Sequence, residues 1–280
     1  MPKDTRRKPN GLHVSVYSRL IRSPLFANEW MQRILVAAYF AYKRFYEDPF
    51  RWLIRHQPEL FSGGDILDVG ANIGYTSWLF AEAVQRGSRV YSLEPDAVCY
   101  RLLVKMLGWK GISSVVTAYQ YAAGRQTGTA RFWHNANHSA DHRVITDEFN
   151  QQGSAAFDVA PVPMTSVDDF VRARGLSRLA FVKIDVQGYE TEVCDGMQQT
   201  LRDFPDAVVC FEYSPDAMAE MGFSPQESIE FFRSRNYSLY IVTRSGLQYI
   251  ADFCDVHSRA LKHGYLDILA TRKRLTATEK

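Results

Sequence analysis

The chain has 280 residues, of which 46% are hydrophobic and 23% are charged, and its formal net charge is +2. This length suits one large domain or one domain with additions, and the composition is ordinary for a soluble globular protein. Basic residues gather at the ends: residues 1–22 hold six Lys and Arg against one Asp, and residues 271–280 hold four against one Glu. The acidic excess of the remaining chain argues against a nucleic-acid groove in its body.

The N-terminal part is expected to contain a tail and a helix. Residues 1–22 read as a flexible basic tail that could weakly contact an anionic membrane surface. Residues 23–60 read as a helical extension, with a strong helix over residues 28–47. The face expected to be buried comprises Trp30, Ile34, Leu35, Ala38, Phe45 and Tyr46. Tyr39 and Lys43 form a Tyr-x-x-x-Lys pair, which we interpret as surface chemistry of this helix.

A glycine-rich turn follows the first predicted strand. Ile66–Val69 is a short apolar run that ends at Gly70, as in a buried parallel strand. The turn has the pattern D-x-G-x-x-x-G from Asp68 to Gly74, with Asn72 where the dinucleotide fingerprint G-x-G-x-x-G has its middle glycine. That glycine admits a pyrophosphate, so its absence favours an adenosine ligand without phosphates. S-adenosylmethionine is the common ligand of this kind, and we count Asn72 among the residues that bind it.

The other positions around this turn have predicted roles. Gly70 lets the backbone approach the ligand, and Gly74 opens a helix whose N–H groups and dipole favour the cofactor carboxylate. Asp68 would pair with the cofactor ammonium or order a water there. Glu94 closes the second strand, Val90–Leu93, where an acid can accept both ribose hydroxyls.

The segment after the third strand departs from the strand–helix alternation. Ala122 lies in the turn after that strand, where an adenine edge would meet backbone groups. Residues 129–165 contain two predicted strands, Thr129–Trp133 and Asp158–Met164, and read as an insertion above the crevice. Such an insertion would serve as a lid or as a platform for the acceptor.

Three histidines in this insertion, His134, His138 and His142, are spaced by four residues. On a helix they would share one face and could bind zinc. Because the intervening residues are poor helix formers, we predict no metal ligand here, and a metal site stays open as an alternative. His138 is the histidine we favour for acceptor binding or for duty as a base.

Acids also end two later strands. Phe181–Ile184 runs into Asp185, and Ala207–Phe211 runs into Glu212. In an open α/β sheet, ligands bind outside the carboxyl ends of the strands, so Asp185, Glu212 and Glu94 should face one crevice. Asp185 is our first candidate for the catalytic base, followed by Glu212 and His138, and it is also expected to contact the cofactor.

These motifs resemble the FkbM-type methyltransferases over roughly residues 60–245. The resemblance lies in Asp-Val-Gly-Ala-Asn-Ile-Gly-Tyr-Thr, Leu-Glu-Pro-Asp and Val-Lys-Ile-Asp-Val-Gln-Gly-Tyr-Glu, with Gln187 where the family usually has Glu. It implies a Rossmann-like α/β fold over residues 61–272, with a seven-stranded, mostly parallel sheet, helices on both faces and an antiparallel last strand. Residues 273–280 would form a second basic tail. The resemblance also implies methyl transfer to a hydroxyl, often on a sugar or secondary metabolite.

The expected partner is thus a small hydroxylated acceptor, and no nucleic acid. Two alternatives stay open: a non-catalytic cofactor-binding protein held at membrane surfaces, and an NAD-dependent oxidoreductase, against which the missing glycine counts. Four cysteines without C-x-x-C spacing read as reduced thiols of a cytoplasmic protein.

Overall fold

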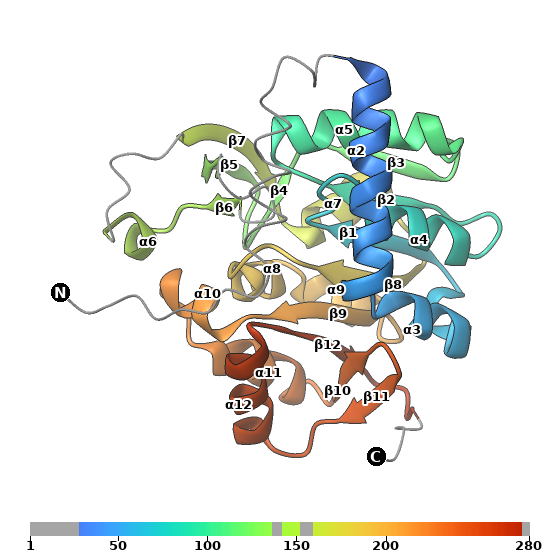
Figure 1. Cartoon of the computed structure of the whole chain (residues 1–280). Helices are drawn as coiled ribbons and strands as arrows, with labels where there is room; N and C mark the ends of the chain where they lie inside the picture. The colour runs from blue at the N-terminus through green and yellow to red at the C-terminus, as the bar shows by residue number, and fades with distance from the viewer. Residues whose placement is uncertain (1–27, 136–141, 152–158, 276–280) are drawn as a thin grey trace.

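The computed structural model describes residues 28–135, 142–151 and 159–275 (Figure 1). Its main sheet has eight strands. In spatial order they are β11 (Gly246–Tyr249), β10 (Ser238–Thr243), β12 (Leu266–Thr271), β9 (Val208–Tyr213), β8 (Leu179–Ile184), β1 (Asp65–Val69), β2 (Val90–Leu93) and β3 (Val116–Tyr119). The predicted fold class is confirmed, and β12 is antiparallel to β9 as expected. The eighth strand, β11, was not predicted and pairs with β10 as a hairpin.

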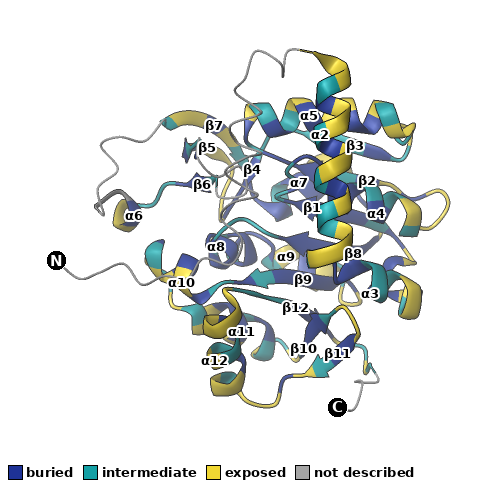
Figure 2. Cartoon of the chain, viewed as in Figure 1, coloured by how far each residue is buried: buried dark blue, intermediate teal, exposed yellow. Residues whose placement is uncertain are grey.

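Helices cover both faces of this sheet. They are α2 (Glu29–Tyr42), α3 (Phe50–His56), α4 (Tyr75–Ala83), α5 (Ala97–Lys110), α7 (Val167–Arg174), α8 (Glu190–Asp195), α9 (Gln198–Asp203), α10 (Pro215–Glu220), α11 (Pro225–Arg233) and α12 (Phe253–His263). A further short helix, α6 (Asp147–Gln151), lies apart from them in the predicted insertion (Figure 1). Successive side chains of each strand point to opposite faces of the sheet, so the core has two parts. Ile66 packs with α4 and α5 on one face, and Leu67 packs with α7 and α11 on the other. Figure 2 shows the strands between the helices as mostly buried.

The predicted insertion forms a second, four-stranded sheet. Its order is β4 (Ala122–Ala123), β7 (Val159–Thr165), β5 (Gly128–Trp133) and β6 (Arg143–Val144). The chain enters this sheet directly after β3, because β4 pairs in parallel with the end of β7. The two predicted strands are therefore present, and the sheet lies beside the carboxyl end of the main sheet (Figure 1).

The N-terminal helix is present, but its predicted buried face is wrong. Trp30, Phe45 and Tyr46 are 67%, 62% and 69% exposed, and Ile34 is exposed as well. Asn28 caps α2 by accepting a hydrogen bond from the N–H of Trp30 at 2.9 Å. After Tyr42 the helix continues as one π-helical turn, Lys43–Glu47, and then a short 3₁₀ turn, Pro58–Phe61, leads into β1.

Packing against α5 decides which face of α2 is buried. Gln32, Val36 and Phe40 form an i, i+4 row that points inward, and Lys105 of α5 donates a hydrogen bond to Gln32 at 2.8 Å. Of the residues predicted to be buried, Leu35 is half-buried, while Ala38 is exposed. Apolar side chains occupy most of the circumference of α2, so its sequence could not select the buried face.

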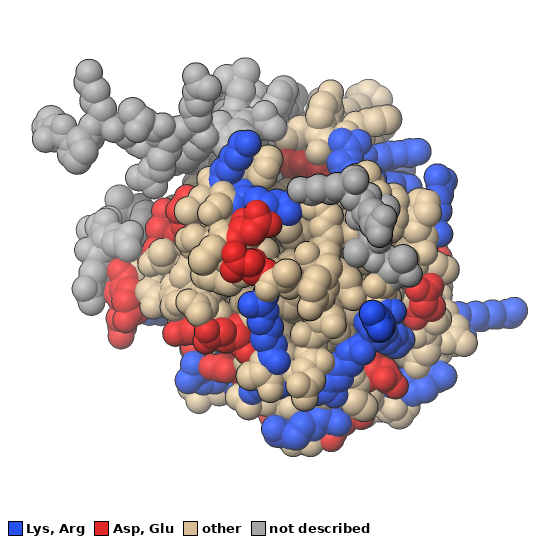
Figure 3. Space-filling model, turned by 90° about the horizontal axis from the view of Figure 1, so that it is seen from below, with Lys and Arg blue, Asp and Glu red and all other residues tan. Residues whose placement is uncertain are grey.

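The remaining expectations about the chain ends can be compared only in part. Residues 1–27 and 276–280, which include the predicted basic tails, lie outside the described residues. All four cysteines are free, and Cys254 is exposed. Within the described ranges, no helix is both long and apolar enough to cross a bilayer. The view from below in Figure 3 shows basic and acidic side chains interspersed around an uncharged centre.

Candidate cofactor and acceptor site

A cavity of about 580 Å³ lies at the carboxyl ends of β1, β2, β8 and β9. Here the strand order reverses, because β1 has β2 on one side and the distant β8 on the other. Ligands of open α/β sheets bind at such a switch point, and this volume suits a small-molecule site. Its lining comes from the turns after β1 and β2, from α2 and from the start of β12.

Both predicted glycines hold conformations that other residues resist. Gly70 has φ +74°, and a Cβ there would stand 1.8 Å from the carbonyl oxygen of Asp185. Gly74 has φ +91° and precedes α4, where a Cβ would lie 2.2 Å from Met106 and 2.5 Å from Leu103. Gly70 therefore lets the β1 turn pass against the β8 turn and lines the cavity, whereas Gly74 fits α4 against α5.

Glu94 is clamped to the first turn. The N–H of Asn72, which has φ +50°, donates to Oε2 of Glu94 at 2.7 Å, and the N–H of Asp96 donates to Oε1 at 2.8 Å. Glu94 is 5% exposed and faces the cavity beside Asn72. Burial raises the pKa of Glu94 to about 8. Each oxygen retains a second lone pair, as the predicted acceptance of ribose hydroxyls requires.

Lys183, to which the sequence analysis gave no role, ties the two central turns together. Its ammonium donates to the carbonyl of Gly70 at 3.0 Å and lies 3.2 Å from Asp185 and 3.7 Å from Asp68. Asp68 is fully buried beneath the turn, where its Oδ2 accepts hydrogen bonds from Thr76 and Ser77. Its other oxygen has no hydrogen-bond partner in the described structure. The positive charge of Lys183 thus compensates the negative charges of Asp68 and Asp185 beside the turn after β1.

Three carboxyl groups line the cavity at the ends of β8, β9 and β12. The β9–β12 register places Asp267 directly opposite Glu212, and both line the cavity with Asp185. The amide of Gln187 donates to Asp185 at 2.8 Å and to Glu212 at 3.3 Å. The sequence analysis missed Asp267, because only the antiparallel pairing of β12 brings it to this edge.

The three carboxyl groups differ in acidity. Burial would raise the pKa of Asp185, but the charges of Lys183 and Lys43 lower it below its ordinary value. Burial and the neighbouring Asp185 carboxylate raise the pKa of Glu212 well above its ordinary value, and raise that of Asp267 to about 7. The cluster therefore combines Asp185, whose carboxylate form is favoured, with two neighbours in which the protonated form is favoured relative to an ordinary carboxyl group.

The N-terminal helix supplies a cation to the same cavity. Lys43 lines it, 2.7 Å from Glu47 and 5.9 Å from the ring of Tyr39. Burial alone would lower the pKa of Lys43, but Tyr39 and Glu47 raise it well above its ordinary value. The interpretation of Tyr39 and Lys43 as surface chemistry was wrong, because α2 lies over the crevice.

The second sheet forms the opposite wall. Ala122, Phe132, His142 and Val144 line the cavity next to Pro95. Ala122 is 2% exposed, and its predicted contact with the adenine stays a prediction. The insertion and α2 thus both contribute to the lining of one cavity.

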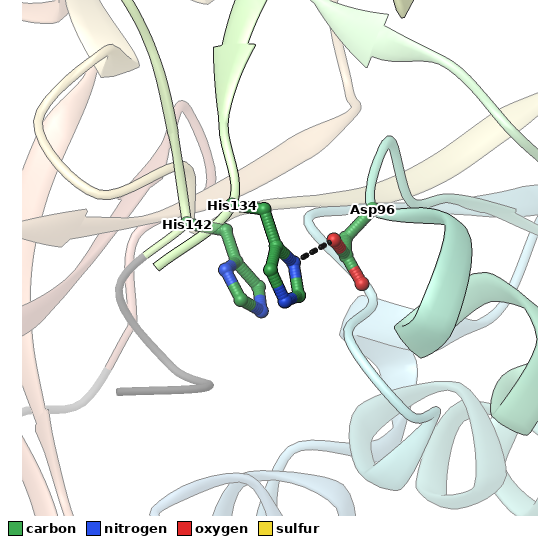
Figure 4. A group of neighbouring side chains, drawn as sticks. All are labelled: Asp96, His134 and His142. Atoms are coloured by element: carbon green, nitrogen blue, oxygen red, sulfur yellow. Dashed lines mark hydrogen bonds and ion pairs between the residues drawn. The ribbon is translucent and has the colours of Figure 1, made fainter. Parts of the chain in front are cut away.

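Two of the three histidines lie together, and His138 lies outside the described residues. The β5–β6 hairpin pairs Trp133 with Arg143, which brings His134 and His142 face to face with ring centroids 4.6 Å apart (Figure 4). Nδ1 of His134 lies 2.6 Å from Asp96, which also caps α5. Burial would raise the pKa of Asp96, but the hydrogen bonds from His134 and from the N–H of Cys99 hold it well below its ordinary value.

Asp96, His134 and His142 offer ligand atoms within 4.8 Å of one another, a grouping that could hold a metal ion. However, the ring planes differ by only 16°, so their in-plane lone pairs do not converge on one point. Nδ1 of His142 also accepts the N–H of Asn135 at 3.0 Å, which places the ring proton on Nε2. This geometry favours a hydrogen-bonded contact between the β5–β6 hairpin and the start of α5 over a metal centre.

The chain is similar to several known proteins. The chain is 25% identical over 176 residues to "Methyltransferase sdnD" of Sordaria araneosa, covering 55% of this chain and 68% of that protein. A solved FkbM methyltransferase from Methylobacillus flagellatus is similar in fold, with 14% identity, a TM-score of 0.48 and coverage of 91% of this chain. The chain spans 57% of the length of that structure. The O-methyltransferase TomG of Streptomyces achromogenes, solved with S-adenosylmethionine, shows 15% identity, a TM-score of 0.48 and coverage of 93% and 96%.

The family model of the methyltransferase FkbM domain matches residues 68–239, which is more than half of the chain and includes the turn after β1, Glu94, Asp185 and Glu212. The protein therefore belongs to the FkbM methyltransferase family, and its cofactor is S-adenosylmethionine.

Proposed function

We propose that the protein is an O-methyltransferase that methylates a hydroxyl group of a sugar or secondary metabolite. The observation that carries this proposal is one continuous cavity, which joins the cofactor cradle at Gly70 and Glu94 to the carboxyl groups of Asp185 and Glu212. An alcohol needs a proton acceptor when it attacks a methyl group, and these carboxyl groups stand where an acceptor would enter.

The cradle fits S-adenosylmethionine. Gly70 lets the turn after β1 lie directly against the Asp185 carbonyl while its backbone lines the cavity, and the buried Glu94 presents a carboxyl group to the cavity. We assign cofactor contacts to Gly70, Asn72, Glu94, Ala122 and Asp185. Gly74 acts through the start of α4, and Asp68 acts from beneath the turn, through Lys183 and the turn itself.

Bound S-adenosylmethionine supplies an electrophilic methyl group. The residues of the cavity must hold the acceptor oxygen in line with it and receive the hydroxyl proton as the new carbon–oxygen bond forms. We assign this proton transfer to the Asp185–Glu212 pair, which Gln187 joins. Asp185 adjoins the Gly70 turn, and its lowered pKa favours the carboxylate that can receive the proton, while burial and the Asp185 charge raise the pKa of Glu212 well above its ordinary value. His138 stays a predicted third candidate.

The test is transfer of labelled methyl from S-adenosylmethionine to a panel of sugars and hydroxylated metabolites. Asp185→Asn and Glu212→Gln should retain cofactor affinity within a few-fold and lower turnover by roughly 10²–10⁴-fold, as for loss of a general base. Asp206→Asn, an exposed loop acid, is the matched control. Full turnover in both site variants would contradict the assignment. Cofactor binding without transfer to any acceptor would favour the non-catalytic alternative.

A further inference from the structure

The outer face of α2 is apolar and, among the described residues, largely uncovered. Trp30 and Ile34 are 67% and 41% exposed, and Ala37, Ala38 and Ala41 are exposed on the same side. Figure 2 shows these exposed turns along the length of the helix. A helix that is apolar around its whole circumference is normally buried, and exposed apolar faces on soluble proteins mark binding sites.

This face is continuous with the cavity. Ile34, Ala38 and Tyr42 form an i, i+4 row on one side of α2. Ile34 is exposed, Ala38 is exposed and also lines the cavity, and Tyr42 lines the cavity from a half-buried position. The row therefore leads from solvent into the cavity without a charged side chain.

The charges near this row point elsewhere. Arg33 is paired with Glu29 at 3.0 Å and stands 5.3 Å over the ring of Trp109, so it is directed toward α5. Lys43 is paired with Glu47 inside the cavity. An apolar path thus begins at the surface and ends at Tyr42, in the cavity that Asp185 and Glu212 also line. This pattern suits a ligand with one apolar and one hydroxylated end.

We propose that the methyl acceptor is an amphiphile, with a hydroxylated head beside Asp185 and Glu212 and an apolar portion that leaves the cavity past Ala38 and lies along Ile34 and Trp30. From Ala38 to Trp30 the helix rises about 12 Å, which sets the length of the apolar segment that it can cover. This inference rests on the proposed function, whose acceptor it defines further.

The experiment measures binding of hexyl, octyl and decyl glucoside, each below its micellar concentration, to the full chain saturated with S-adenosylmethionine. In the wild type, Kd should fall roughly tenfold from hexyl to decyl, because methylenes on an open face leave water only in part. Ile34→Ser should flatten this dependence and leave cofactor affinity unchanged. Tyr249→Ser, which replaces a 58% exposed residue on β11, should keep it.

The outcomes separate the inference from the proposed function. Failure of the wild type to bind S-adenosylmethionine would overturn the proposed function itself. If the protein bound the cofactor normally but its affinity for the glucosides did not change with alkyl length, only the proposal of an amphiphilic acceptor would be overturned. A different occupant of α2 would also overturn the amphiphile proposal. If monomeric glucosides showed no trend with alkyl length, and Ile34→Ser abolished binding to anionic vesicles or self-association, then a membrane or a second copy of the chain would cover α2.

Discussion

Replacing Lys183 with methionine would leave two buried carboxyl groups without their cation. The Lys183 side chain is 6% exposed, with Nζ 3.2 Å from Asp185, 3.7 Å from Asp68 and 3.0 Å from the carbonyl oxygen of Gly70. Removal of one partner from a buried ion pair typically costs about 3–5 kcal/mol. Because the Asp185 side chain is 32% exposed and water can screen it, we expect the lower end, about 3 kcal/mol at pH 7.

The loss should depend on pH. In the wild type, Lys183 helps to hold the pKa of Asp185 below its ordinary value, so this ionised carboxylate stabilises the fold above the unfolded-state pKa, and the contribution is lost as pH falls through the folded-state pKa. In Lys183→Met the Asp185 carboxyl group lacks the Lys183 charge that lowers its pKa, so we expect it to take up a proton at a higher pH than in the wild type. The stability gap between the two proteins should therefore narrow from pH 7 to pH 4.

Urea unfolding of both proteins at pH 7, 5.5 and 4 measures this gap. Lys105→Met is the control, because Lys105 is exposed and donates a hydrogen bond to Gln32, and it should lose less than about 1 kcal/mol. If Lys183→Met lost no more than the control, or if its loss did not change with pH, the electrostatic reasoning about the central turns would be refuted.

Two further predictions concern the cofactor cradle. With a pKa of about 8, Glu94 is mostly protonated at pH 7, whereas ribose hydroxyls donate hydrogen bonds more strongly to its ionised form. The affinity for S-adenosylmethionine should therefore rise from pH 7 to pH 9, and binding near pH 7 should release a proton. Calorimetry in buffers of different ionisation enthalpy measures both effects. Glu94→Gln should bind more weakly and show no such dependence, and a pH-independent wild type would argue against ribose recognition. Gly70→Ala should destabilise the fold and abolish cofactor binding, because its Cβ meets the Asp185 carbonyl at 1.8 Å. Gly87→Ala, with φ +89° and open space around it, should cost only about 1 kcal/mol of conformational strain and retain binding; equal losses in thermal unfolding would contradict the close approach.

The sequence by itself determined the parts of the site that depend on local pattern. Four short apolar runs predicted β1, β2, β8 and β9, because buried parallel strands need continuous apolar residues. Gly70 predicted the turn, because glycine, which has no Cβ, adopts the backbone conformations that a tight turn requires. Glu94, Asp185 and Glu212 could be placed at one edge, because parallel strands present their carboxyl ends on the same side of a sheet.

Only the tertiary structure decided which distant segments complete the cavity. The apolar circumference of α2 gave no preference for one face, and packing of Gln32, Val36 and Phe40 against α5 turned Tyr39 and Lys43 toward the crevice. The antiparallel return of β12 brought Asp267 opposite Glu212, a pairing that no local spacing encodes. The β5–β6 hairpin likewise joined His134 to His142, since contacts between residues far apart in the chain depend on strand pairing and helix packing rather than on local periodicity.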